Sequence, residues 1–499
     1  MHLGAVDIVV LAVYLASAVL VGLVASGKAK NLEGYLLGNR DLPWWAILGS
    51  IVATETSTAT VLSVPGKAYG PDGMRFLQLA LGYIIGRAVI VHALLPLYFE
   101  GKLFTAYQVL DRRFGGLTKQ AASLLFLVTR NLGDGLRLFL AAIVLQKLAG
   151  LPPDWRLAGL DSFVWSVIAM GAVTIVYTFF GGMRSVVWND CIQLVVYMLG
   201  GVAAVFVIAA NIPGGWSELV RYGQEHGKFQ VFDFRPSLSY PFTFWAGLIG
   251  GAVLTIGTHG TDHMMVQRYL SARSQNEAGR AVFLSGLVVL VQFALFLFIG
   301  VELACYYAGR PEMKFSSTDD VFADFIVHQF PQNVGLVGLL LAAILAAAMS
   351  TLSSSLNSSA SALVNDFYAP GRKTPASQEH LFGVTRGLTV LFGCVQIGIG
   401  IWARQLGKAV VDNALAIAGF SAGLLLGVFA LGVLTRRAGQ TAALAGGLAG
   451  LAVLLVVQFG LPKWGISIAF PWLALIGAST TFTVGWLISL PLPARGTSE

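Results

Sequence analysis

The stretch Leu42–Val64 reads LPWWAILGSIVATETSTATVLSV, and it decides what kind of fold the chain can adopt. It is long enough to cross about 30 Å of hydrocarbon as a helix. Its middle, Thr54–Thr60, is almost entirely polar and holds Glu55 at mid-depth. Non-helical backbone is tolerated at that depth only where it is buried in protein or lines a cavity. We therefore expect a helix that breaks at the midplane, where unwound carbonyls and hydroxyls can bind an ion or a solute.

A continuous helix is the alternative for this stretch. Its Thr and Ser hydroxyls would then bond back to carbonyls of their own turns, and Glu55 would be protonated. The tight clustering of a glutamate with several hydroxyls favours the broken helix.

The composition of the whole chain indicates an integral membrane protein. Apolar residues make up 56% of the 499 residues and charged residues 11%, whereas soluble domains carry about 25% charged residues. The net charge of +7 is spread over short loops, so nucleic-acid binding is not expected. The three cysteines show no metal-ligand spacing and no disulfide framework. There is no phosphate loop ending in Gly-Lys-Ser/Thr and no His-Glu-x-x-His motif, so we expect no enzyme, no cofactor and no use of ATP.

Hydropathy predicts an all-α fold with about thirteen transmembrane helices in one polytopic domain, residues 1–499. No cleavable signal peptide is evident, because Lys28 and Lys30 follow the first apolar run. Most Lys and Arg then fall in loops on one side, which predicts an N-terminus outside and a C-terminus in the cytoplasm. Short loops favour a plasma membrane, in particular a bacterial inner membrane, and we expect the lipid bilayer but no obligate protein partner. The approximate limits of the spans are 6–25, 44–64, 75–98, 118–148, 162–180, 187–209, 241–262, 281–308, 334–364, 381–403, 411–434, 440–460 and 467–489.

The seventh span resembles the second in being interrupted. Glycines 247, 250, 251, 257 and 260 precede a polar group that runs from Thr258 to His263. Paired glycine-interrupted spans at corresponding positions indicate an inverted repeat with the binding site between its halves. The halves would be residues 44–209 and 241–434, and the spans within 440–489 would be peripheral. His259 is equally consistent with a packed histidine and with a solute contact, and Asp262 and His263 are expected at the cytoplasmic edge.

The ninth span carries a run of hydroxyls within a long apolar helix. Ser350, Ser354, Asn357 and Ser358 fall at i, i+4, i+7 and i+8, so they share one face. Hard monovalent cations bind several oxygens, and neighbouring hydroxyls beside a broken helix can supply them. A packing seam of small residues is the alternative.

Three charged residues of the fourth span are spaced to meet. Arg130, Asp134 and Arg137 are separated by four and three residues. One arginine is neutralised by Asp134, and the other needs a partner. That partner is either a solute carboxylate or an internal acid, Glu55 or Asp190.

At these residues the sequence resembles the sodium:solute symporter family, over about residues 6–435. The stretches that carry the resemblance are GNRDLPWW (38–45), FGGMRSVVWNDCIQ (180–193), VQRYL (266–270) and the serine-rich span through NDFY (365–368). The resemblance implies thirteen spans and a LeuT-type core of two inverted five-helix repeats. It also implies a sodium site made by the backbone carbonyls of Ala53, Thr56 and Ala347 with the hydroxyls of Ser350 and Thr351.

Further roles follow from the same resemblance. Glu55 falls where the proline-transporting members have an important aspartate, which implies a coupling-ion carboxylate. Asp190 matches an aspartate on the inward sodium path. Thr258 and His259 replace aromatic residues of the sugar transporters, which disfavours a sugar. Arg137 matches the carboxylate-binding arginine of the sialic-acid members, which favours an anionic solute.

The prediction is therefore sodium-coupled symport of a small organic solute, with sodium as the coupling ion. A proton-coupled symporter that uses Glu55 is the main alternative. Sugar or amino-acid uptake, or a transport-inactive sensor or channel, are remoter ones. The predicted solute contacts are Thr58, Thr60, Arg137, Thr258, His259, Ser354 and Asn357.

Overall fold

The computed structural model describes residues 4–26, 31–148, 155–310, 312–313, 315, 317–405 and 410–491. These residues are nearly all helical, apart from loops and one short antiparallel hairpin. The elements are α1 (Ala5–Ser26), α2 (Leu32–Leu37), η1 (Gly38–Arg40), α3 (Trp44–Glu55), α4 (Thr58–Tyr69), η2 (Gly73–Leu77), α5 (Gln78–Val89), η3 (Ile90–Leu94), α6 (Leu95–Phe99), α7 (Gln108–Phe114), α8 (Gly116–Leu148), β1 (Arg156–Leu157), β2 (Leu160–Asp161), α9 (Ser162–Ala210), α10 (Gly215–Glu225), η4 (Ala246–Gly250), α11 (Gly251–Gly260), α12 (His263–Leu270), α13 (Gln275–Ala308), α14 (Asp320–Gln329), α15 (Leu336–Ala362), η5 (Leu363–Tyr368), α16 (Gln378–Trp402), α17 (Val410–Leu434), α18 (Gln440–Leu455), η7 (Val456–Gly460), η8 (Leu461–Trp464) and α19 (Phe470–Ser489).

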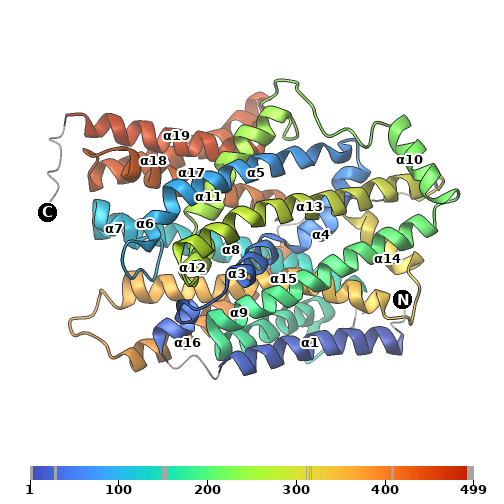
Figure 1. Ribbon diagram of the computed structural model, residues 1–499, viewed down its shortest axis with the longest axis horizontal. Coiled ribbons are helices and arrows are strands. Elements are labelled where there is room, and N and C mark those ends of the chain that lie inside the picture. The colour runs from blue at the N-terminus through green and yellow to red at the C-terminus, as the bar shows by residue number, and fades with distance from the viewer. Residues whose placement is uncertain are drawn as a thin grey trace.

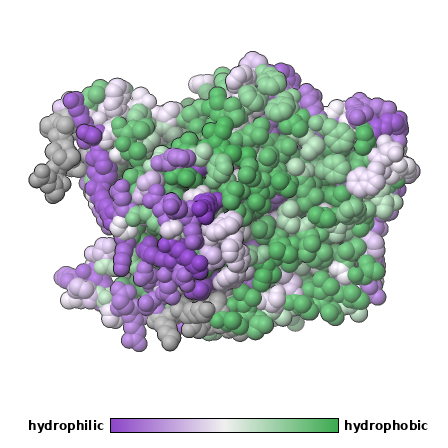
Figure 2. Space-filling view, in the orientation of Figure 1, coloured by the Kyte–Doolittle hydropathy of each residue, from purple (hydrophilic) through white to green (hydrophobic). Residues whose placement is uncertain are grey.

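The long helices lie side by side along one direction, which is horizontal in Figure 1. Helix α1 begins at the right of that view and α19 ends at the left, so the first residue of α1 and the last residue of α19 lie at opposite ends of the bundle. Figure 2 shows a broad hydrophobic face between a hydrophilic left end and smaller hydrophilic groups at the right edge. A bundle with an apolar belt and polar ends is the arrangement that a bilayer requires.

The number of spans agrees with the prediction once the broken helices are included. Nine helices among the described residues are long and apolar enough to cross a membrane, and the bent pair α3–α4 makes ten. Three further crossings are α8, the interrupted helix η4–α11–α12, and the second half of α9. These bring the total to the thirteen expected from hydropathy.

Helix α9 contains two spans because Gly182 interrupts it. A helix of 49 residues would extend about 73 Å, more than twice the hydrocarbon thickness. Gly182 has φ 55° and ψ −151°, which are not helical. A Cβ added at Gly182 would lie 2.4 Å from the carbonyl oxygen of Tyr35, so only glycine fits this turn.

Helices α3 and α4 are separated at the predicted place. Thr56 and Ser57 have ψ values of 114° and 171°, and the two helices meet at an angle of 60°. The Thr60 hydroxyl replaces a missing helical bond, because its Oγ1 accepts from Ser57 N at 3.2 Å, and the Thr56 hydroxyl adds a bond to Val52 O at 2.8 Å. The continuous helix is therefore excluded.

The seventh span is also broken, as expected. Helix α11 ends at Gly260, and α12 begins at His263 with Asp262 as its N-cap in an extended conformation. Helix α15 runs between the two breaks. It is the most buried of the long helices: 89% of the residues in its most apolar stretch of 18 are buried, against 22% for α1. The ninth span therefore contacts protein on all sides.

The loops rich in Lys and Arg meet at one end of the bundle. Arg40 Nη2 donates to Leu103 O at 2.6 Å, and Arg113 Nε donates to Gly432 O at 3.1 Å. Leu42 N donates to Ser271 O at 3.1 Å. We call this end of the molecule the basic end.

Candidate functional site

A cavity of about 590 Å³ lies beside the first helix break and extends away from the basic end. Its mouth is lined by Lys67, Asp72, Tyr240 and Asp319. Burial and the neighbouring Asp72 carboxylate raise the pKa of Tyr240 to about 12, so its hydroxyl stays protonated and donates to Asp72 at 2.7 Å. Deeper residues of the lining are Glu55, Ser57, Thr60, Ser63, Tyr83, Thr129, Arg130, Arg137, Thr255, Thr258, His259, Asp262, Met264, Met265, Phe293, Ile417, Ser421 and Phe470.

The last turn of α3 presents carbonyl oxygens at the break. In a continuous helix Ser57 N would donate to Ala53 O, but it bonds to Thr60 Oγ1 instead. Thr54 O accepts the Thr351 hydroxyl at 3.2 Å. Carbonyls at a helix C-terminus carry partial negative charge that favours a cation. The break therefore supplies ligands of the kind that sodium binds.

Helix α15 completes this group of oxygens. Thr351 Oγ1 lies 3.2 Å from Thr54 O and 3.4 Å from Ala347 O, so it joins α15 to the end of α3. Ser350 is turned differently, because its hydroxyl donates to Asp190 Oδ1 at 2.6 Å. The structure thus brings Thr351 and Ala347 to the last turn of α3, where the predicted ligand Ala53 is fully buried.

The hydroxyl of Thr56 points away from this group. It donates to Val52 O and lies 3.1 Å from Tyr197 OH and 3.0 Å from Gln292 Oε1. These bonds fix the non-helical backbone at the break. Only the carbonyl of Thr56 was predicted as a ligand, so the side chain has a positioning role that the sequence did not indicate.

Asp190 belongs to a buried network toward the basic end. It accepts hydrogen bonds from Ser50 and Ser350 and pairs with Arg268 Nη2 at 3.2 Å. Arg268 also donates to Ser50, Thr54 and Ser354, so one guanidinium joins α12 to α3, α9 and α15. This contact closes the space between the first break and the basic end.

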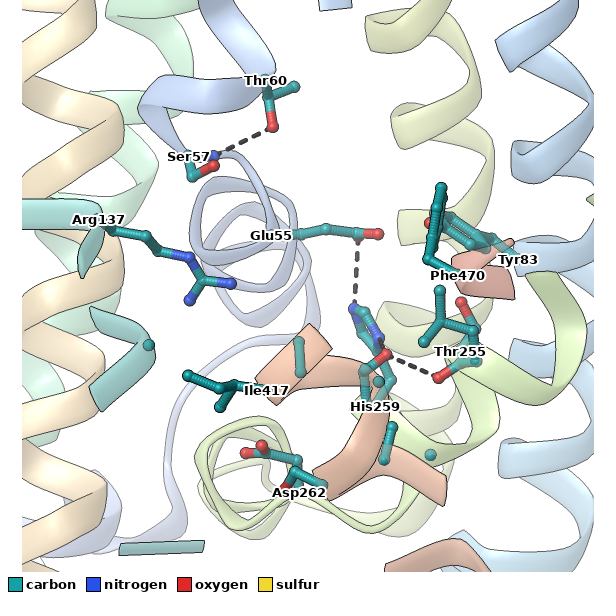
Figure 3. A pocket seen from close by; sticks show the side chains of 18 of the residues that line it. Glu55, Ser57, Thr60, Tyr83, Arg137, Thr255, His259, Asp262, Ile417 and Phe470 are labelled. Atoms are coloured by element: carbon teal, nitrogen blue, oxygen red, sulfur yellow. Dashed lines mark hydrogen bonds and ion pairs between the residues drawn. The ribbon is translucent and has the colours of Figure 1, made fainter. Parts of the chain in front are cut away.

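Glu55 is ion-paired and does not stand alone. It pairs with Arg87 of α5, and its Oε2 lies 3.4 Å from His259 Nε2 of α11. Figure 3 shows the contact between Glu55 and His259 in the cavity. The His259 Nδ1 lies 2.9 Å from the Thr258 hydroxyl. His259 is therefore a hydrogen-bonded packing residue that also lines the cavity.

Arg137 and Arg130 share Asp134 but differ in what else they contact. Arg137 Nη1 lies 2.5 Å from Asp134 Oδ1 and Arg130 Nη1 lies 3.8 Å from it. Arg130 also pairs with Asp262, whereas the Arg137 side chain is 32% exposed and faces the cavity. The prediction that Glu55 or Asp190 is the internal partner is wrong for Arg130, because Arg130 pairs with Asp262 from the second break. Asp262, which was expected at the cytoplasmic edge, lines the cavity.

The predicted solute contacts fall into two groups. Thr60, Arg137, Thr258 and His259 line the cavity, and the side chain of Thr58 lies outside the described residues. Ser354 and Asn357 are not among the lining residues. Ser354 contacts Arg268, and Asn357 Oδ1 accepts from Gln267 Nε2 at 3.0 Å.

The sequence analysis did not predict the aromatic wall of the cavity. Tyr83, Phe293 and Phe470 come from three different helices and form an aromatic side opposite Arg137, which Figure 3 shows for Tyr83 and Phe470. Aromatic residues in apolar spans are common, so no sequence signal distinguishes these. The cavity therefore presents a cationic side and an aromatic side.

Comparisons with known proteins identify the family of the chain. The family model described as the sodium:solute symporter family matches residues 35–450. The human sodium/iodide cotransporter is 28% identical over 92% of this chain and 70% of its own. The human sodium-coupled monocarboxylate transporter 1 is 28% identical over 87% and 70%.

The fold agrees as well. A solved structure of a Na⁺-coupled sialic acid symporter, in a substrate-bound outward-open state, matches with a TM-score of 0.86 and 27% identity, over 98% of this chain and 99% of that one. This match confirms the predicted LeuT-type fold with broken helices. The chain belongs to the sodium:solute symporter family and is a multi-pass, sodium-coupled membrane transporter.

Proposed function

We propose that the protein transports a small organic solute with a carboxylate group together with sodium, and that Arg137 binds the carboxylate. The observation that carries the proposal is the position of Arg137. Both paired arginines line the cavity, but the Arg137 side chain is 32% exposed against 15% for Arg130, which is also bonded to Asp262. A guanidinium binds a carboxylate in a planar, bidentate geometry.

The charges around the cavity favour an anion that arrives with a cation. Arg87 pairs with Glu55, and Arg130 and Arg137 face Asp262 and Asp134. The formal charges of these six side chains therefore balance before any ligand binds. Sodium alone adds a positive charge to a low-dielectric site, and a carboxylate restores the balance. This balance couples the two ligands, and the coupling is reciprocal.

The start of α4 supports an anionic solute as well. Ser57, Thr60 and Ser63 line the cavity at the N-terminal end of this helix. Backbone N–H groups at a helix N-terminus favour negative charge. The C-terminal end of α3, two residues away, favours the cation. Opposite helix ends thus face each other across one break.

The order of events follows from which contacts each ligand stabilises. Sodium at Ala53, Thr56, Ala347, Ser350 and Thr351 holds α15 against the end of α3 while the cavity is open away from the basic end. Solute then binds beside it. When the bundle rocks, Arg268 releases its hold on Ser354 and Asp190, and both ligands leave past Asp190.

Similarity to named transporters supports the solute class. The human relative is named for monocarboxylates and the solved structure for sialic acid, and both names describe carboxylate-bearing solutes. The aromatic wall of this cavity suits an apolar body attached to the carboxylate. We accordingly place monocarboxylates with an apolar body ahead of sugars and amino acids.

The proposed setting is a plasma membrane with the basic end in the cytoplasm. Loops rich in Lys and Arg gather at the end where α19 finishes, and α1 begins at the other. The positive-inside rule then places the start of α1 outside. Residues 44–209 and 241–434 would form the two repeats, since each begins with a broken span.

The test is uptake into proteoliposomes with an inward sodium gradient, comparing benzoate, lactate and sialic acid with benzamide and glucose. We expect sodium-dependent uptake of a carboxylate and none of the uncharged compounds. Arg137→Gln should lower the affinity for that carboxylate by about 30-fold or more, since a charge-assisted bond contributes about 2 to 3 kcal/mol. Arg221→Gln, on an exposed helix with 61% side-chain exposure, is the matched control. Full uptake by Arg137→Gln would contradict the proposal.

Proton coupling through Glu55 remains a second candidate because Glu55 lines the cavity at the break. Its pairing with Arg87 argues for a lasting negative charge. Uptake driven by a pH gradient without sodium, and lost in Glu55→Gln, would replace sodium coupling by proton coupling.

A further inference from the structure

A groove of about 760 Å³ lies on the outer surface between α1 and the second half of α9, away from the transport cavity. Its walls are apolar: Leu20, Val24 and Val195 are 61%, 72% and 56% exposed. Such side chains face hydrocarbon when the bundle lies in a membrane. Figure 1 shows α1 and α9 together at the lower edge of the bundle.

The packing of α1 explains why the groove exists. Asp7 at the start of α1 accepts hydrogen bonds from the backbone of Asn333 and Gly335 at 2.8 and 3.0 Å. Near its other end, a Cβ added at Gly22 would lie 2.6 Å from the Cβ of Tyr177. The helix is thus held at two points by other elements. Tyr14 in the middle of α1 also accepts a hydrogen bond from Gln193 of the second half of α9 at 3.3 Å, and the groove is the uncovered part of this boundary beside Leu20 and Val24.

The groove ends in a positive charge beside the basic end. Arg184 lines it and follows the turn at Gly182. Within the described residues Arg184 makes only long contacts, 3.5 Å to Gly38 O and 3.9 Å to Asp41. Asp41 is already bonded to Arg273 at 2.9 Å. Two arginines thus share one aspartate, and one positive charge remains for an outside partner.

Two tryptophans near Arg184 indicate where this end of the groove lies relative to the lipid headgroups. Trp188 lines the groove and packs edge to face against Trp45, with ring centroids 5.3 Å apart. Trp45 is 50% exposed. Tryptophan gathers at the level of lipid headgroups. The Arg184 guanidinium therefore lies where a phospholipid phosphate would be, with the apolar walls running toward the bilayer centre.

We propose that this groove is a binding site for an anionic phospholipid, whose phosphate contacts Arg184 and whose acyl chain lies along Leu20, Val24 and Val195. Charge complementarity selects the anionic headgroup, and basic pockets between helices near the cytoplasmic side commonly bind such lipids. The site is independent of the transported solute. Its test therefore does not depend on the proposed function.

The test is native mass spectrometry of the purified protein with phosphatidylglycerol or phosphatidylcholine of identical acyl chains. We expect the wild type to retain phosphatidylglycerol about fivefold better, the ratio expected for about one favourable lysine or arginine contact. Arg184→Gln should abolish the preference. Val195→Phe, which fills the groove from an exposed position, should lower binding of the retained lipid. Arg221→Gln, at the opposite end, should behave as wild type.

Three results would overturn the proposal. One is an equal retention of both lipids by the wild type, which indicates ordinary surrounding lipid. Another is an unchanged preference in Arg184→Gln. The third is complete competition by millimolar inorganic phosphate with no effect of Val195→Phe, which indicates a simple anion contact. Melting temperatures of all variants in phosphatidylcholine check that they fold alike.

Discussion

The two helix breaks each contain extended backbone, but they use their carbonyl groups differently. At the first, between α3 and α4, Thr54 O accepts one hydroxyl from α15 and Ser57 N is diverted away from Ala53 O. At the second, between α11 and α12, side chains cover the exposed carbonyls. Tyr269 OH donates to His259 O at 2.9 Å, and Tyr98 OH donates to Gly260 O.

The acid at the second break caps a helix and also pairs with an arginine of α8. Asp262 caps α12 by accepting from Met264 N at 2.8 Å, and it pairs with Arg130. An unwound helix is therefore not in itself a binding site. At the first break, by contrast, Ala53 O has lost its helical partner Ser57 N, and this is why we propose the ion site there.

The largest effects on stability are expected when the acid at either break, Glu55 or Asp262, is replaced by its amide. Glu55→Gln removes the anion that pairs with the buried Arg87 and should cost about 3 kcal/mol of unfolding free energy. Asp262→Asn should cost less, because Arg130 is 15% exposed and keeps Asp134 as a partner. Asparagine keeps the cap, so Asp262→Asn tests the ion pair alone. Only Glu55→Gln should also weaken stabilisation by sodium, because Glu55 ends the helix whose carbonyls are the proposed sodium ligands.

Chemical denaturation in sodium and in choline chloride measures both quantities for both variants. The comparison between the breaks fails if Asp262→Asn reduces the sodium effect as much as Glu55→Gln. The second break would then belong to the ion site.

A smaller effect is expected from the hydroxyl that covers the second break. Tyr269→Phe should cost about 1 kcal/mol, because it leaves the buried carbonyl of His259 without a partner. Its response to sodium should equal that of the wild type. Tyr35→Phe, which removes 3.1 Å bonds to Thr178 O and Thr389 Oγ1 at a site outside both breaks, is the matched control. If sodium stabilised Tyr269→Phe less than it stabilises Tyr35→Phe, sodium binding would depend on the second break.

The architecture was predictable because it depends on local patterns. Polar residues at Thr54–Thr60 inside an apolar run predicted the first break, and glycines before Thr261 predicted the second. The pair Arg137–Asp134 followed from helical spacing alone. Each of these signals is contained within one span.

Contacts between spans were not predictable in the same way. Arg130 and Asp262 lie 132 residues apart, and periodicity gives no information on which distant acid an arginine meets. Arg268 was visible in the VQRYL stretch, but its bonds to three other helices depend on packing. Ser350 and Ser354 do share a face of α15, yet spacing could not say that Asp190 and Arg268 occupy it.

The most direct test of the first break as the sodium site is the melting temperature of the purified protein across a sodium titration, with choline chloride holding ionic strength constant. A ligand that binds only the native state stabilises it by mass action. Thr351→Ala removes the α15 hydroxyl that contacts the end of α3. This variant should need about tenfold more sodium for the same shift in melting temperature. Ser358→Ala removes a hydroxyl from the same helix that bonds only to its own turns, at 2.8 and 3.2 Å, and should match the wild type. A titration of Thr351→Ala that coincides with both would contradict the account.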